Sequence, residues 1–121
     1  MHNGSFSMQP RSPKILEDIR DAATFVRAVT ATETLATYGT NRLLRQAVER
    51  NFEIIGEAMR RLDHHDPETA RRVPNYARVI AFRNILIHGY DLIDHVLVWD
   101  TIHQHLPALQ SAIEMLLAEA E

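Results

Sequence analysis

Hydrophobic residues along the chain recur at intervals of three and four, which is the spacing of one face of an α-helix. The longest such stretch runs from about residue 41 to residue 62. Its stripe consists of Leu44, Val48, Phe52, Ile55, Met59 and Leu62. A stripe of this length predicts a helix with one face in the core, and we expect it to be the central helix of the fold.

Several predicted helices begin at a side chain suited to capping. Ser12-Pro13 is a good helix start, with Ser12 as N-cap and proline at the first helical position. Asn41 and Asp94 are candidate N-caps for the helices that follow them. Asp66, followed by proline, can begin a short helix. Residues 30 to 40 are rich in threonine and predict either a connection or a weak helical turn.

The second half of the chain continues with helical spacing from Tyr76 to a stop at Gly89, then from Asp94 to Ile102, and again after Pro107. No segment alternates polar and apolar residues with a period of two. We therefore predict an all-α, up-and-down bundle of four to five helices. Its single domain would span residues 13–121, after a disordered N-terminal lead-in at residues 1–12.

The length of 121 residues suits one domain with one modest core. The chain has no cysteine, so it has neither disulfides nor thiolate chemistry. Its first residues lack the apolar run of a signal peptide, and no apolar segment is long enough to cross a bilayer. We therefore expect a cytoplasmic protein without a membrane role.

Charge is distributed unevenly along the sequence. The formal net charge is -3, which argues against a general nucleic-acid coat. Residues 42 to 83 carry nine arginines and six acidic residues, whereas residues 84 to 121 carry six acidic residues and no lysine or arginine. This asymmetry fits a local polyanion site, and it equally fits pairing between the two parts of the chain or with a second copy.

The most unusual cluster of polar residues is found at residues 83 to 90. Arg83, Asn84 and His88 surround the aliphatic run 85–87, which we expect to be buried, holding the polar residues at the edge of the core. Asn84 and His88 share one helix face, whereas Arg83 lies about 140° from His88, so these two meet most easily across a groove. Gly89 is a natural residue to follow a helix end, which places His88 in the last turn.

Spacing alone leaves a structural role open for these residues, with a histidine at a helix end and an arginine in a salt bridge. Glu53 and Glu57 lie with Arg50 on a charged line of the central helix. This line is either a solvated face of salt bridges, or Glu57 or Glu53 pairs with Arg83 and holds it in place. Gly56 precedes Glu57 and lowers helix propensity. A glycine there makes sense if another backbone approaches closely.

Other chemistry lacks a motif. Seven histidines include His95 and His103 at helical spacing, but no H-E-x-x-H arrangement occurs. The sequence has no phosphate-binding glycine loop, dinucleotide fingerprint or nucleophile elbow. We therefore expect neither a metal site nor a cofactor.

Arg83-Asn84 followed by His88-Gly89-Tyr90 fits the R-x4-H-x-Y motif, and in this the chain resembles the HepT-like proteins of the HEPN superfamily. Residues 47–58 are similar to that family's long second helix, and residues 96–99 and 106–109 to its last helical pair. The resemblance covers about residues 13 to 118. Tyr76 departs from the pattern, because the family more often has tryptophan there.

This resemblance implies a HEPN-like bundle and the toxin of a type VII-like toxin-antitoxin pair, acting on RNA as a metal-independent endoribonuclease. His88 would be the general acid or base, Arg83 would stabilise charge on the phosphate, and Asn84 would orient the phosphate or His88. Glu57 would support Arg83. A minimal nucleotidyltransferase antitoxin would silence the toxin by attaching AMP to Tyr90.

A homodimer is also implied, and the motif agrees, since one copy offers only one arginine and one histidine for a reaction that needs acid, base and charge stabilisation. The alternative is a non-catalytic helical partner that binds a nucleotidyltransferase or a nucleotide through the same residues.

Overall fold

The structure, a computed structural model, describes residues 7–89 and 93–120. These two stretches form seven helices and no strand, so the predicted all-α fold is confirmed. The helices are α1 (Ser12–Thr30), α2 (Leu35–Thr40), α3 (Arg42–His65), α4 (Pro67–Ala70), α5 (Tyr76–His88), α6 (His95–Gln104) and α7 (Leu106–Ala120). Within the described ranges, no helix combines the length and apolar character needed to cross a membrane.

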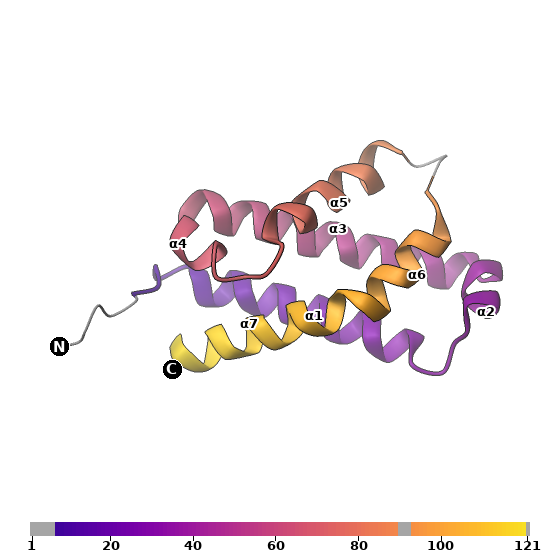
Figure 1. Cartoon of the computed structure of the whole chain (residues 1–121), viewed down its shortest axis with the longest axis horizontal. Helices are drawn as coiled ribbons and strands as arrows, with labels where there is room; N and C mark the ends of the chain where they lie inside the picture. Colours follow the sequence, from indigo (N-terminus) through magenta and orange to yellow (C-terminus); the bar gives the residue numbers. More distant parts are fainter. Residues whose placement is uncertain (1–6, 90–92, 121) are drawn as a thin grey trace.

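Helix α3 is central, as its long apolar stripe predicts. Helices α1, α2, α4 and α5 all pack against it, while α7 packs on α1 and α6 joins α7 to α2 (Figure 1). The start of α1 and the end of α7 lie at the same end of the bundle. The two short helices, of six and four residues, fill the turns before and after α3.

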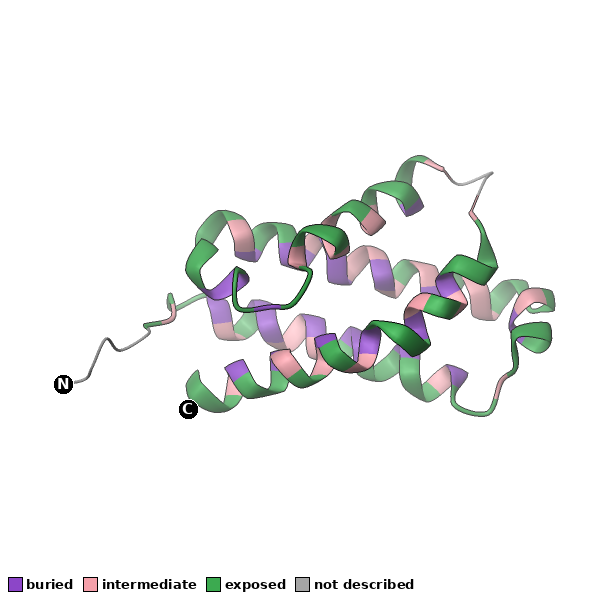
Figure 2. Ribbon diagram, in the orientation of Figure 1, coloured by how far each residue is buried: buried purple, intermediate pink, exposed green. Residues whose placement is uncertain are grey.

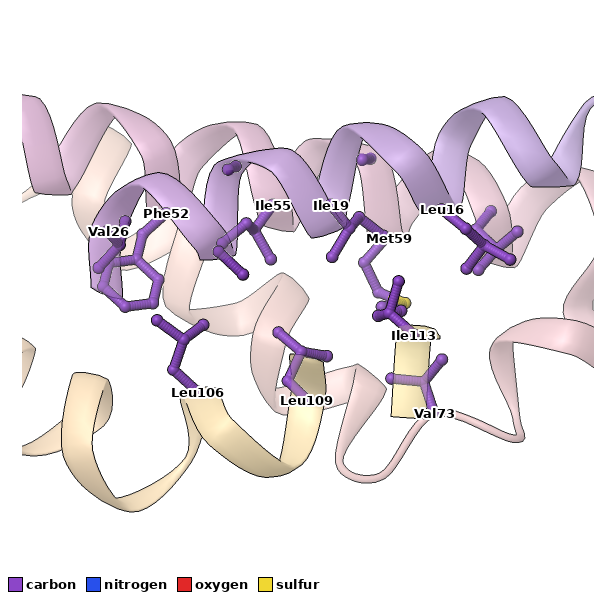
Figure 3. Close-up of a cluster of buried hydrophobic side chains, with 14 of the residues drawn as sticks. Leu16, Ile19, Val26, Phe52, Ile55, Met59, Val73, Leu106, Leu109 and Ile113 are labelled. Atoms are coloured by element: carbon purple, nitrogen blue, oxygen red, sulfur yellow. The ribbon is translucent and has the colours of Figure 1, made fainter. Parts of the chain in front are cut away.

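The core lies between α1, α3 and α7. Large aliphatic side chains from these three helices meet there, and Val73 joins them from the loop after α4 (Figure 3). The buried faces of α1 and α3 run along most of their length, whereas α5 is largely exposed (Figure 2). The bundle is therefore well packed on one side of α3 and more open on the side where α5 lies.

Three of the four predicted helix starts are confirmed and one is wrong. Asp66 is the N-cap of α4, and its side chain accepts from the Thr69 amide. The side-chain oxygen of Asn41 accepts from the Leu44 amide at 3.0 Å, and that of Asp94 accepts from the Val96 amide at 2.9 Å. Helix α1, however, already includes Ser12, and its N-cap position is Arg11. The reason is tertiary, because the Ser12 hydroxyl donates instead to a carboxylate between the end of α3 and the start of α4.

That carboxylate belongs to Asp66, which is only 3% exposed. It accepts hydrogen bonds from the Gln9 amide at 3.0 Å, the Ser12 hydroxyl at 2.7 Å, and the Thr69 hydroxyl and amide at 2.6 and 3.2 Å. Burial alone would raise the pKa of Asp66, but the donors from Thr69, Gln9 and Ser12 outweigh burial and hold the pKa below its usual value. Gln9 lies in the stretch 1–12, and the domain boundary at residue 12 stays a prediction.

The expected burial of the run 85–87 is wrong for two of its three residues. Leu86 is 2% exposed, but Ile85 and Ile87 are 52% and 38% exposed. Helix α5 packs mainly on α3, so in its last turns only one position per turn faces that helix. Two large aliphatic side chains are left at the surface beside the motif.

Candidate active site

Gly56 sets the position of Arg83. A Cβ atom at Gly56 would lie 2.2 Å from the Cβ of Arg83 and 3.1 Å from the carbonyl oxygen of Val79. Because glycine has no Cβ, α5 can pack this closely on α3. The close approach inferred from the sequence is therefore present, and the residue that it brings in is the arginine of the motif.

The guanidinium of Arg83 is held by Glu57, the residue that follows Gly56 on α3. The nearest atoms are Nη2 of Arg83 and Oε1 of Glu57, 3.2 Å apart. Glu57 also binds Arg60, whose Nε and Nη2 donate to its two carboxylate oxygens at 3.2 and 3.0 Å. Both expectations for Glu57 thus hold, since it lies on a partly solvated charged line and also anchors Arg83.

Asn84 is the second partner of Arg83. Nη1 of Arg83 donates to the side-chain oxygen of Asn84 at 3.0 Å, which leaves the Asn84 amide group as a donor. The Arg83 side chain is 25% exposed, and its Nε is buried without a hydrogen-bond partner among the described residues. Glu57 and Asn84 therefore fix the arginine from two sides, while its Nε–H group makes no hydrogen bond to the described residues.

His88 forms the last residue of α5, as predicted from Gly89. The amide of Gly89 donates to the carbonyl of Ile85 at 2.9 Å and closes the helix. The imidazole of His88 is exposed and makes no hydrogen bond or ion pair with other residues in the described part of the chain. The structure thus joins Arg83, Asn84 and Glu57, but it does not link His88 to them. Tyr90 lies outside the described residues.

The histidines of α6 have structural contacts. Nδ1 of His103 lies 2.9 Å from the carbonyl oxygen of Trp99, and the two rings are 4.3 Å apart. Trp99 in turn packs on the buried Tyr38 ring, with centroids 5.4 Å apart. Among residues 7–89 and 93–120, no group of three or more histidine or acidic side chains is arranged to hold a metal ion.

One feature near the motif has no clear signal in the sequence. Phe52 of α3 and Phe82 of α5 pack edge to face, with ring centroids 5.3 Å apart, and both line a cavity between α3, α5 and the junction of α6 with α7. Both phenylalanines sit on helix faces that predicted core packing. Only the tertiary arrangement reveals that the core opens there.

Comparison with known proteins gives consistent relatives. The model of the family described as "Ribonuclease HepT-like" matches residues 15–116. A protein of Methanocaldococcus jannaschii named "Putative RNase MJ1380" is 34% identical over 101 residues, covering 84% of this chain and 88% of its own length. "Probable ribonuclease HepT" of Thermococcus cleftensis is 28% identical over 101 residues, covering 84% of this chain and 91% of its own length. No solved structure gives a significant match.

The family match spans most of the chain, including the central helix and the Arg83 to His88 segment. The relatives are aligned over nearly their whole length and carry ribonuclease names. The chain therefore belongs to the HepT-like ribonuclease family.

Proposed function

We propose that this protein is the toxin of a toxin-antitoxin pair and cleaves RNA as a metal-independent endoribonuclease. The observation that carries the proposal is the Arg83 guanidinium, fixed by Glu57 and Asn84, five residues before the exposed His88 at the end of the same helix. A preorganised cation and an accessible imidazole near the same helix end are groups that phosphodiester cleavage uses.

The chemistry follows from these groups. An imidazole removes the proton of a ribose 2′-hydroxyl, and the oxygen attacks the adjacent phosphorus. The bond from phosphorus to the 5′-oxygen then breaks, and that oxygen takes up a proton. Arg83 neutralises the charge that builds on the phosphate, and the free amide of Asn84 donates to a phosphate oxygen. The products would be a 2′,3′-cyclic phosphate and a 5′-hydroxyl.

This reaction needs an acid and a base, whereas the motif of one chain supplies a single histidine. We propose that two copies associate beside the motif, so that two His88 side chains share one cleft. Exposed aliphatic side chains within the motif and shortly after it support this proposal. They are Ile85 and Ile87 at the end of α5, and Val96 and Leu97 at the start of α6, each between 38% and 52% exposed.

We further propose that a nucleotidyltransferase antitoxin attaches AMP to Tyr90, two residues beyond His88. The added phosphodiester would bring negative charge and bulk to the place where RNA must approach Arg83. Coexpression with the partner should add one or more adenylate groups to the peptide that holds Tyr90. Tyr90→Phe should remain toxic, and an unmodified Tyr90 peptide in inactivated protein would favour simple sequestration.

The deciding experiment is incubation of the purified protein with end-labelled RNA in EDTA. Cleavage that leaves a cyclic phosphate supports the proposal, and His88→Ala and Arg83→Ala should each abolish it. Circular dichroism should show the same helix content in both variants, because neither change opens a large cavity. Intact RNA together with tight binding of the nucleotidyltransferase would instead identify a non-catalytic partner.

A further inference from the structure

A cavity of about 320 Å³ opens between α5, the end of α6 and the start of α7, at the lower end of the size range of small-molecule sites. Its floor is apolar, with Phe52, Phe82 and Leu109 among the lining residues. An edge-to-face aromatic pair in the wall offers a surface on which another flat ring can pack. The cavity is distinct from the cluster of Arg83, Asn84 and Glu57, none of which lines it.

The rim of this cavity is polar and carries no acidic residue. Asn75, Arg78, Gln104 and His105 line it, and none of their side chains has a hydrogen bond or ion pair within the described ranges. Asn75 has a left-handed backbone, with φ of 59°. Two amides and a guanidinium without partners, placed around an apolar floor, suit a ligand that has a flat ring with hydrogen-bonding edges and a negative charge.

We propose that this cavity binds one unstacked nucleobase of the RNA substrate. The base would enter against Phe82, its polar edge would meet the amides of Asn75 and Gln104, and a neighbouring phosphate would lie on Arg78. Single-stranded RNA is commonly recognised by such stacking on aromatic rings and by amide contacts to base edges. The inference rests on the proposed ribonuclease function and adds a specificity site to it.

The position of the cavity relative to His88 fits one continuous strand. Arg78 and His88 are ten residues apart on α5, which places them about 15 Å apart along the helix axis and about 80° apart around it. The exposed Ala81 and Ile85 lie between them in both respects, so the surface that joins the two positions is apolar and accessible. A strand with its scissile phosphate at His88 would reach the cavity a few nucleotides away.

Filling the cavity from α7 tests the proposal without touching α5. Ala108 lines the cavity and is exposed, so Ala108→Trp should occupy the space meant for the base. Ala118→Trp adds the same side chain to the same helix at an exposed position outside the cavity, and serves as the matched control. Asn75→Gly, which keeps the left-handed backbone but removes the amide, tests the rim. Thermal unfolding of each variant checks its fold.

Two measurements separate this inference from the proposed function. The first is kcat/KM for a single-stranded RNA octamer and for a dinucleotide that reaches only the scissile bond. Ala108→Trp should lower the octamer value about ten- to hundredfold, which is the range for loss of one stacked base. The dinucleotide value should not change, and Ala118→Trp should match the wild type on both substrates. Asn75→Gly should alter the preference among octamers that differ in one base.

The second measurement is the binding of a fluorescent RNA octamer to His88→Ala, which remains informative if no RNA is cleaved. If Ala108→Trp weakens octamer binding tenfold or more in the His88→Ala background, the cavity binds RNA even if the ribonuclease proposal fails. Equal octamer affinity with and without the tryptophan would overturn it. If AMP, CMP, GMP or UMP binds and loses affinity in Ala108→Trp while the octamer does not, the cavity is a site for free nucleotides and the RNA proposal is wrong.

Discussion

Arg83 shares its anchoring carboxylate with another arginine. Glu57 receives two hydrogen bonds from Arg60 and one ion-pair contact from Arg83. The hydrogen bond from Arg60, followed by the charges of Arg60, Arg83 and Arg61, holds the pKa of Glu57 below its usual value despite partial desolvation. Glu57 is therefore ionised throughout the neutral range, and its hold on Arg83 is lost only as the pH falls through this lowered pKa.

Replacing Glu57 should impair catalysis through Arg83. Glu57→Gln removes the carboxylate charge and keeps the size of the side chain. We expect kcat to fall about tenfold, which corresponds to roughly 1.4 kcal/mol in activation free energy, with little change in KM. Arg60→Ala is the control, because it removes the other partner and leaves the Arg83 contact in place. Steady-state cleavage kinetics measure both. An equal loss in the two variants would mean that Glu57 does not act through Arg83.

Asp66 offers a stability test at the same scale. Asp66→Ala leaves buried donors at Ser12 and Thr69 without an acceptor, so we expect a loss of about 2–4 kcal/mol in the free energy of unfolding. Urea denaturation measures it. Asp18→Ala, which removes an exposed pair with Lys14, should change stability by less than about 1 kcal/mol.

The stability that Asp66 contributes should fall as the pH is lowered. Its pKa is lower in the folded chain than in the unfolded chain, so its contribution is fully present above the unfolded pKa and declines as the pH falls through the folded pKa. The difference in stability between the wild type and Asp66→Ala should therefore become smaller in strong acid, where only the neutral carboxyl remains as an acceptor. A difference that stays constant down to that range would argue against the role of the charge.

At the scale of helices, the sequence predicts what depends on neighbours in the chain. The stripe of α3, the stop at Gly89 and the caps at Asn41 and Asp94 are local features, and all are present. Features that depend on tertiary contacts were harder to predict. Ser12 looks like an N-cap but donates to Asp66 at the end of the neighbouring helix α3, a partner that no local pattern reveals.

The candidate site shows the same division. Gly56 signalled a close approach, yet only the structure identifies the approaching residue as Arg83. Glu57 had two plausible roles that spacing could not separate, and it performs both. The exposure of Ile85 and Ile87 could not be foreseen because it depends on how few helices cover the end of α5. The roles of Arg83, Asn84 and His88 in catalysis stay predictions.

The contact between α3 and α5 can be tested by a double-mutant cycle. Gly56→Ala would place a Cβ atom 2.2 Å from that of Arg83, so α5 must move away and we expect a loss of about 1–3 kcal/mol in stability. Arg83→Gly removes the opposing Cβ. In that background Gly56→Ala should cost clearly less, although the Val79 carbonyl still crowds the site. Equal costs in both backgrounds would mean that the helices separate for another reason.

At the scale of the whole molecule, the more open side of the bundle is also the side that carries the motif. Exposed aliphatic residues at the end of α5 and the start of α6 lie on both sides of residues 90–92, which hold the proposed modification site. A second copy covering this region would bury them and complete the site. Catalysis would then depend on dimer formation, because the same contact forms the dimer and completes the cleft.

We expect the protein to sediment as a dimer at micromolar concentration. Leu97→Glu should raise the dissociation constant at least about tenfold, because it would place a charge in an apolar contact, and it should reduce cleavage in proportion to the dimer lost. Met115→Glu, at an exposed position of α7 away from the motif, is the control and should leave both unchanged. Full ribonuclease activity in a species that sediments as a monomer would refute the shared cleft.

Trp99 is the only tryptophan of the chain, and it packs between the buried ring of Tyr38 and the imidazole of His103. Its fluorescence therefore reports on one place, the contact of α6 with α2. Trp99 lies on α6 just after Val96 and Leu97, which belong to the proposed interface. Trp99 is thus an intrinsic fluorescent probe, and any partner that shifts α6 should change the wavelength or the intensity of its emission. The proposed association, RNA binding and antitoxin contact can each be tested in this way on the unmodified chain.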